Sequence, residues 1–173
     1  MNEDNVASAT LHLLTGPWAS GKSTLVPILA SLLPGVVVFD WDVVLPGVSA
    51  ASGRDAHTDP STWGGLKEIW AAIIHSVLAG GRDVLLCGPA RPEDFGAGSG
   101  ARHPIRCAYL ECGDELLAAR LLARGETDAA IADELGEMAA LRKSGHHPVR
   151  VEGRTPDEIA REVAAWVGGR PTA

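Results

Sequence analysis

Short runs of apolar residues alternate along the chain with longer stretches in which apolar residues recur every three or four positions. The short runs predict buried strands at residues 10–16, 35–40, 82–88, 105–112 and 148–153. The longer stretches predict helices at residues 22–33, 61–80, 114–125, 126–145 and 155–167. Because strands and helices alternate throughout, helical crossovers must join the strands. The pattern therefore predicts an α/β fold with a parallel sheet and helices on both of its faces.

Length and composition indicate one globular domain. The chain has 173 residues, of which 46% are hydrophobic and 21% charged. The N-terminal stretch is acidic and polar, and no apolar run approaches the roughly 18 residues of a membrane span, so we expect a cytoplasmic protein with no membrane partner. The formal net charge of −7 argues against a protein that coats nucleic acid. The spacing of Cys87, Cys107 and Cys112 predicts neither a disulfide framework nor a zinc site.

The first predicted strand runs into a glycine-rich segment, GPWASGKST, which opens the first predicted helix. The segment fits G-x-x-x-x-G-K-[S/T] at every fixed position, in the strand–loop–helix setting that this pattern requires. Glycines let successive backbone N–H groups turn towards a phosphate, and the helix N-terminus adds partial positive charge. We expect Lys22 to reach the outer phosphates of a nucleoside triphosphate and the Ser23 hydroxyl to ligate Mg²⁺. The predicted nucleotide-binding residues are Gly16, Pro17, Ala19, Ser20, Gly21, Lys22, Ser23 and Thr24.

Two aspartates, Asp40 and Asp42, end the second predicted strand. Because the carboxyl ends of parallel strands meet at one edge of a sheet, we expect the pair to face the glycine-rich segment. Residues two positions apart in an extended chain point the same way. One carboxylate could then reach Mg²⁺ while the other accepts a proton from an incoming hydroxyl group. The alternative is that either aspartate caps a turn after the strand.

The glycine-rich segment, the pair D-x-D after the second strand and the segment RLLAR before an acidic helical stretch together resemble the small P-loop kinases. Shikimate kinase, gluconate kinase, chloramphenicol phosphotransferase and the nucleoside monophosphate kinases belong to this group. The resemblance covers nearly the whole chain in element order, although only the glycine-rich segment is highly specific. It implies a three-layer P-loop NTPase fold with five parallel strands in the order 2-3-1-4-5. The domain would have a core at residues 10–124 and 146–168 and a helical lid at about 125–145.

The resemblance also implies an activity, the transfer of the γ-phosphate of Mg·ATP to a hydroxyl group of a small molecule. By position, Asp40 would serve the metal and Asp42 the substrate, as the catalytic base. Gly88, after the third strand, would offer its backbone N–H to the substrate, and Arg91 would clamp it, unless Arg91 is an ordinary surface arginine. The third strand lacks the aspartate that commonly ends it in the wider P-loop class.

Two arginines precede the predicted lid. Arg120 and Arg124 lie four positions apart, and so on one face of a helix. Directed at the phosphates, they would neutralise charge on the transferred group; the alternative is two solvated side chains. In the similar kinases the first such arginine packs against adenine and the second contacts phosphate. Arg154, in the turn EGRTP, is a candidate stacking partner for adenine, and the lack of an Asn-Lys-x-Asp motif favours ATP over GTP.

The phosphate acceptor is the least specified part of the sequence. Residues 43–60 and 89–103 should form its pocket, and their mixed polar and aromatic residues fit a nucleoside, a sugar or an antibiotic equally well. We expect Trp18 to pack outward, His57 to be an exposed loop residue, and 95–102 to be a flexible loop. The oligomeric state is left open between monomer and homodimer.

Two further functions fit the glycine-rich segment. A polynucleotide 5′-hydroxyl kinase would share the loop and the base, but the acidic balance of the chain weighs against nucleic acid as a partner. A nucleotide-dependent switch would need a residue to position water near the γ-phosphate. The chain has no glutamine for that role.

Overall fold

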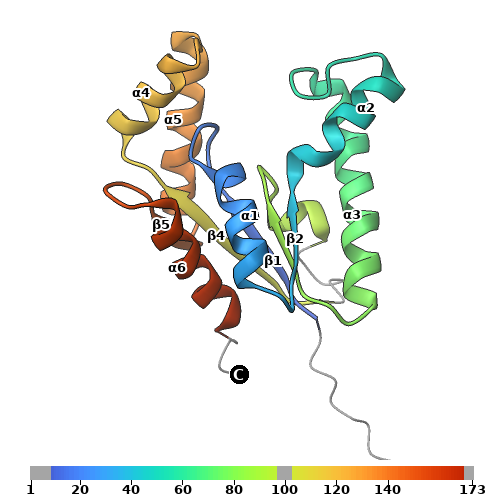
Figure 1. Ribbon diagram of the computed structural model, residues 1–173. Helices are drawn as coiled ribbons and strands as arrows, with labels where there is room; N and C mark the ends of the chain where they lie inside the picture. The colour runs from blue at the N-terminus through green and yellow to red at the C-terminus, as the bar shows by residue number, and fades with distance from the viewer. Residues whose placement is uncertain (1–8, 97–102, 170–173) are drawn as a thin grey trace, which may run out of the picture.

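A parallel sheet of five strands runs through the centre of the computed structural model, which describes residues 9–96 and 103–169 (Figure 1). The strands are β1 (Leu11–Thr15), β2 (Val37–Asp40), β3 (Val84–Cys87), β4 (Ile105–Glu111) and β5 (His147–Arg150). Their order is β2-β3-β1-β4-β5, and every neighbouring pair is parallel. This confirms the predicted fold class and strand order. Residues 97–102 of the predicted flexible loop lie outside the described residues.

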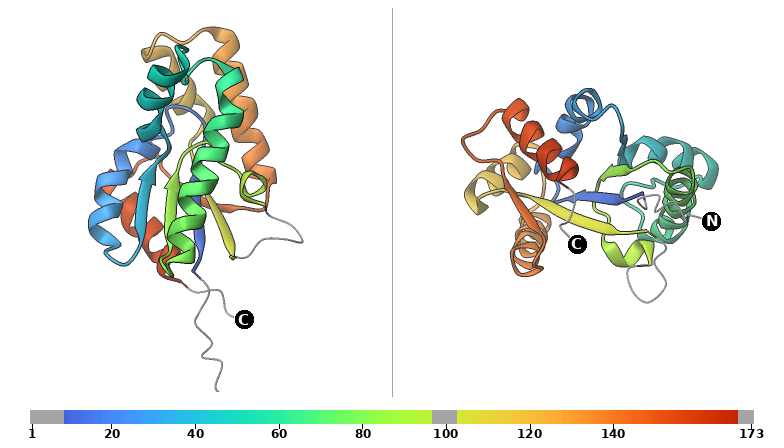
Figure 2. Two further views of the ribbon diagram at one scale, coloured as in Figure 1. Left: turned by 90° about the vertical axis from the view of Figure 1, so that its right-hand side faces the viewer. Right: turned by 90° about the horizontal axis from the view of Figure 1, so that it is seen from below.

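Helices cover both faces of the sheet. They are α1 (Lys22–Leu32), α2 (Leu45–Ser52), α3 (Trp63–Ala79), α4 (Asp114–Ala123), α5 (Asp128–Lys143) and α6 (Pro156–Gly168), with short 3₁₀ turns η1 (Trp41–Val44), η2 (Pro60–Thr62) and η3 (Pro92–Phe95). Helices α1 and α6 lie side by side on one face (Figure 2). Thr155 caps the start of α6, where its hydroxyl accepts from the backbone N–H of Glu158. Within the described residues, none of the helices is long and apolar enough to cross a bilayer.

Alternating side chains of the strands divide the core into two clusters. In β3, Leu85 and Cys87 face the cluster that includes α1 and α6, whereas Val84 and Leu86 face the cluster that includes α3. All four are fully buried because the sheet is covered on both sides. This burial explains why β3 reads as an unbroken apolar run.

The carboxyl ends of the strands form the edge at which the chain builds its loops. Above this edge, α4 and α5 rise on one side and α2 and α3 on the other (Figure 1). The turns after β1, β2 and β3 lie between them. Residues of these turns, α3 and α5 line a cavity at this edge, as expected for parallel α/β proteins.

The region 43–60, expected to form part of the acceptor pocket, contains the helix α2, which the sequence pattern did not predict. Helix α2 has only eight residues and buries only Leu45. An apolar period cannot be recognised over so short a length.

Candidate functional site

The glycine-rich loop, residues 16–21, connects β1 to α1 with an unusual backbone. Gly16 and Gly21 have φ angles of 151° and 109°, and Ala19 is the one non-glycine residue with positive φ among the described residues. A Cβ atom on Gly16 would lie 2.9 Å from Ser20 Oγ and 3.4 Å from the carbonyl oxygen of Leu110. Positions 16 and 21 therefore need glycine, the first for space and conformation and the second for conformation alone.

Lys22, the first residue of α1, folds its side chain back over this loop. Its ammonium group donates to the carbonyl oxygens of Gly16 and Pro17, at 2.7 and 2.9 Å, and to Ser20 Oγ at 3.3 Å. Burial lowers the pKa of Lys22 to about 8, although the carboxylates of Glu134, Asp42 and Asp40 raise it in part. The negative charge of a phosphate bound at the loop would therefore stabilise the protonated form of Lys22.

The two aspartates do not lie on one extended strand. Asp40 ends β2, but Asp42 belongs to the turn η1, and its backbone N–H donates to Asp40 Oδ1 at 3.2 Å. The alternative, that an aspartate caps a turn, is therefore correct for Asp40, whose Oδ1 accepts this hydrogen bond. The prediction that the two residues lie in extended backbone and point the same way was wrong. Both residues nevertheless line the same cavity as Lys22.

The carboxyl group of Asp42 is less acidic than usual. Partial removal from water raises its pKa first, and the negative charge of Asp40 raises it further. His57 and Lys22 act in the opposite direction. A carboxylate whose pKa is raised is a better proton acceptor than one in free solution.

The turn η1 is anchored by a buried tryptophan, Trp41. Its ring stacks on Trp70 at a centroid distance of 5.8 Å, and its carbonyl oxygen accepts a hydrogen bond from Trp70 Nε1 at 3.2 Å. Gly88 makes room for it, because a Cβ atom there would lie 2.3 Å from Trp41 Cβ. The N–H of Gly88 donates to the carbonyl oxygen of Leu14 at 3.1 Å. Gly88 therefore shapes the turn, and the expectation that its N–H binds substrate conflicts with this bond.

Two cavities meet at the glycine-rich loop. The α3-side cavity, of about 660 Å³, is lined by the loop, η1, α3 and α5. The α6-side cavity, of about 420 Å³, is lined by the loop, α4 and α6. The residues that line both are Ala19, Gly21, Thr24 and Arg124. The loop is therefore the common wall of two spaces, each large enough for part of a small ligand.

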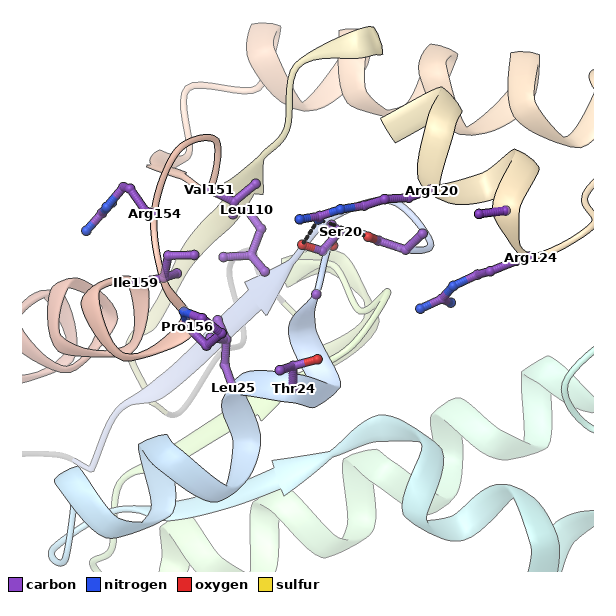
Figure 3. A pocket seen from close by; sticks show the side chains of 13 residues that line it. Ser20, Thr24, Leu25, Leu110, Arg120, Arg124, Val151, Arg154, Pro156 and Ile159 are labelled. Carbon is purple, nitrogen blue, oxygen red and sulfur yellow. Dashed lines mark hydrogen bonds between the residues drawn. The ribbon is translucent and has the colours of Figure 1, made fainter. Parts of the chain in front are cut away.

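The α6-side cavity combines an apolar floor with arginines (Figure 3). Its apolar wall is formed by Leu110, Val151 and Ile159. Nη1 of Arg120 donates to the carbonyl oxygens of Ala19 and Ser20, both at 3.3 Å. Arg120 thus lies across the glycine-rich loop, which brings together two elements that the sequence places a hundred residues apart.

Two other predicted arginines of this cavity differ in orientation. Arg124, next to the end of α4, is exposed, and its side chain makes no hydrogen bond or ion pair with the described residues. Arg154 points away from the cavity in Figure 3, where it donates to the Arg150 and Glu158 carbonyl oxygens and pairs with Glu162. Arg154 would have to release Glu162 before it could stack on a base.

The α3-side cavity carries aromatic and acidic side chains. Trp18 and Trp63 are 37% and 47% exposed and both line it. The ring of Trp18 lies 4.7 Å from that of His57 between centroids. His57 is exposed and lies in a turn, as expected, and its contact with Trp18 places both rings at the cavity wall.

Acidic residues of α5 reach the same cavity and were missed as site residues. The Glu137 carboxylate pairs with Arg91 at 2.6 Å, and Glu134 accepts a hydrogen bond from the backbone N–H of Trp18 at 2.7 Å. In the sequence they belong to a group of three acidic residues in the predicted lid, Asp133, Glu134 and Glu137. Without the fold, such a cluster is indistinguishable from a solvated helix face.

The donors for a metal ion are few. Ser23 and Asp40 both line the α3-side cavity beside Lys22. Among the described residues no group of three histidine, cysteine or acidic side chains is arranged to hold a metal. This pair suits Mg²⁺ bound mainly through phosphate and water, because Mg²⁺ commonly takes only one or two protein ligands.

The sheet order and the glycine-rich loop define a three-layer P-loop NTPase fold. The chain superposes on shikimate kinase from Aquifex aeolicus with a TM-score of 0.59 and 17% identity, covering 91% of this chain and 96% of that one. For a gluconokinase from Sinorhizobium meliloti the TM-score is 0.55 with 20% identity, covering 93% and 92%. For the tunicamycin resistance protein of Deinococcus radiodurans it is 0.65 with 16% identity, covering 92% and 96%.

No family model matches the sequence, and no curated protein sequence does so either. The similarity to known proteins is thus one of structure, and at these identities it establishes the fold alone. It confirms the resemblance in fold to the small P-loop kinases that the sequence indicated.

Proposed function

We propose that the protein is an ATP-dependent phosphotransferase that moves the γ-phosphate of Mg·ATP to a hydroxyl group of a small molecule. The observation that carries this proposal is the position of the glycine-rich loop between two cavities. A phosphate-binding loop with space on both sides can hold a nucleotide on one side and an acceptor on the other. A hydrolase or a switch needs only the first of these spaces.

The adenosine group is assigned to the α6-side cavity. Leu110, Val151 and Ile159 offer it an apolar surface, and Arg120 lies beside the glycine-rich loop, where it can contact base or phosphate. The triphosphate then follows the loop towards Lys22, and Arg124 borders both spaces. Arg120, Arg124 and Lys22 would together neutralise charge on the transferred group.

Asp42 is the proposed catalytic base. It lines the α3-side cavity with Lys22, and its raised pKa suits a proton acceptor. The acceptor's hydroxyl proton passes to the Asp42 carboxylate as the acceptor oxygen bonds to phosphorus. The bond from phosphorus to the β–γ bridging oxygen breaks, and ADP leaves. Ser23 and Asp40 would hold Mg²⁺, which neutralises charge on the phosphate oxygens.

The acceptor is assigned to the α3-side cavity by its size and walls. A volume of about 660 Å³ is in the range of small-molecule sites. Exposed Trp18 and Trp63 supply flat apolar surface, and Arg91 and His57 supply polar groups. This set suits a compact molecule with both apolar and hydroxyl-bearing parts.

The test is ADP release from Mg·ATP with and without candidate acceptors. A panel of nucleosides, sugars, shikimate-like acids and hydroxyl-bearing antibiotics should include at least one that accelerates ADP release, with phosphate appearing on the acceptor. Slow ADP release that no acceptor changes would favour the switch. Acceleration by 5′-hydroxyl oligonucleotides alone would favour the polynucleotide kinase.

A further inference from the structure

A carboxylate of α5 is bound to the glycine-rich loop. Glu134 Oε2 accepts a hydrogen bond from the backbone N–H of Trp18 at 2.7 Å. Trp18 lies in the middle of GPWASGKST, where the backbone N–H groups are the donors available to a phosphate. Trp18 is not among the predicted nucleotide-binding residues, but its neighbours Pro17 and Ala19 are, so this charged oxygen lies against the loop directly beside them.

The same carboxylate acts on Lys22. Among the charges that favour protonated Lys22, that of Glu134 contributes most, ahead of Asp42 and Asp40. The Glu134 carboxylate thus binds the loop backbone and stabilises the charged form of Lys22. An outer phosphate bound at the loop would do both as well. A phosphate in that place would meet a negative charge at close range.

A second bond holds the same face of α5. Glu137, one helical turn beyond Glu134, pairs with Arg91 through both carboxylate oxygens, at 2.6 and 2.8 Å. Residues three apart share one face of a helix. The two contacts therefore tie α5 to the loop after β1 and to the segment after β3, both of which line the α3-side cavity.

We propose that Glu134 is an autoinhibitory latch, whose carboxylate holds α5 against the empty glycine-rich loop and must leave before the outer phosphate of ATP can bind there. This inference rests on the proposed function, because it takes the loop as the phosphate site. The Glu137–Arg91 pair is the second half of the latch, and its release frees Arg91 to meet the acceptor. The apparent Kd for the nucleotide is then the intrinsic Kd divided by the fraction of molecules that are unlatched.

The test uses the full chain and Mg·ATP binding measured by calorimetry. Glu134→Gln keeps the shape and helix propensity of the side chain but removes its charge. Since charge-assisted hydrogen bonds are roughly twice as strong as neutral ones, we expect Mg·ATP to bind about fivefold to tenfold more tightly. Glu134→Ala, which removes the acceptor altogether, should bind at least as tightly as Glu134→Gln.

Asp128→Asn is the matched control. It removes the same charge from α5 at an exposed position that lines neither cavity, and the side chain of Asp128 makes no hydrogen bond or ion pair with the described residues. We expect its affinity for Mg·ATP to change less than twofold. Equal gains in the Glu134 and Asp128 variants would reduce the effect to general electrostatics and overturn the latch.

Two other outcomes separate this inference from the proposed function. Unchanged or weaker binding by both Glu134 variants would remove the latch and leave the kinase proposal standing. A wild-type protein that does not bind Mg·ATP, together with Glu134→Ala that does not bind it either, would remove the proposed function itself. Melting temperatures of all variants, expected within a few degrees of wild type, show that the folds are comparable.

Discussion

The two cavities beside the glycine-rich loop differ in how they are built and in what they carry. The α6-side cavity has apolar walls and arginines and is formed by β4, α1, α4 and the turn before α6. The α3-side cavity has tryptophans and five carboxylates, Asp40, Asp42, Asp133, Glu134 and Glu137. This difference matches the proposed division of the site. In that proposal the α6-side cavity holds the adenosine group, and the α3-side cavity holds the acceptor together with Lys22, the base and the metal donors.

The largest effect should come from Lys22, which lines the α3-side cavity and holds its ammonium group over the glycine-rich loop. Lys22→Ala removes the cation at the loop and should lower kcat/KM with ATP by roughly 10³-fold, because no other lysine lines either cavity close to the loop except Lys67, which is paired with Asp94. Steady-state ADP release measures it. Lys143→Ala, which removes an exposed lysine at the end of α5, is the control and should be silent. Equal losses in the two variants would show that Lys22 has no special role.

A smaller but sharper effect separates the two aspartates. Asp42→Asn should lower kcat at least about 100-fold with little change in ATP affinity, as loss of a general base does. Asp40→Asn keeps an oxygen that can accept from the Asp42 N–H, and it should instead raise the Mg²⁺ concentration needed for half-maximal rate. Rates and Mg²⁺ titrations of both variants measure this. If Asp42→Asn turns over near normally, Asp42 is not the base.

The smallest effect concerns pH and the nucleotide alone. The pKa of Lys22 is lowered to about 8 in the free protein, so its charge is lost as pH rises through 8. Bound phosphate favours the charged form, so affinity must fall with rising pH. From pH 7 to pH 9 the Kd for Mg·ATP should rise up to about tenfold, since one pKa unit corresponds to a factor of ten.

Lys22→Arg is the control for this pH dependence, because arginine stays charged throughout. Its Kd, whatever its absolute value, should stay flat between pH 7 and pH 9. A parallel rise in both proteins would place the titrating group elsewhere.

The two cavities also differ in how far the sequence predicts them. The glycine-rich loop was predictable because its pattern encodes backbone geometry, and the positive φ angles of Gly16 and Gly21 agree with it. The strand order followed from the resemblance that this loop anchors. Arg120 lies beside the loop, and its role in nucleotide binding stays a prediction.

The α3-side cavity depends on contacts that no local pattern encodes. The turn at Asp40 and Asp42 is set by Trp41, which packs against Trp70 and Gly88 from distant parts of the chain. Glu134 reaches Trp18 across 116 positions, and Glu137 reaches Arg91 across 46. Side-chain partners of this kind are fixed by tertiary packing, so only the fold reveals them.

The division of the site between nucleotide and acceptor is tested most directly by mapping where Mg·ADP binds, from backbone amide shifts of the ¹⁵N-labelled protein. The largest changes should fall on the glycine-rich loop, on Arg120 and on residues 151–159 around the α6-side cavity. Trp63 and Leu66 in α3 should change little until an acceptor is added. Changes confined to the α3-side cavity, or none at saturating Mg·ADP, would contradict the account.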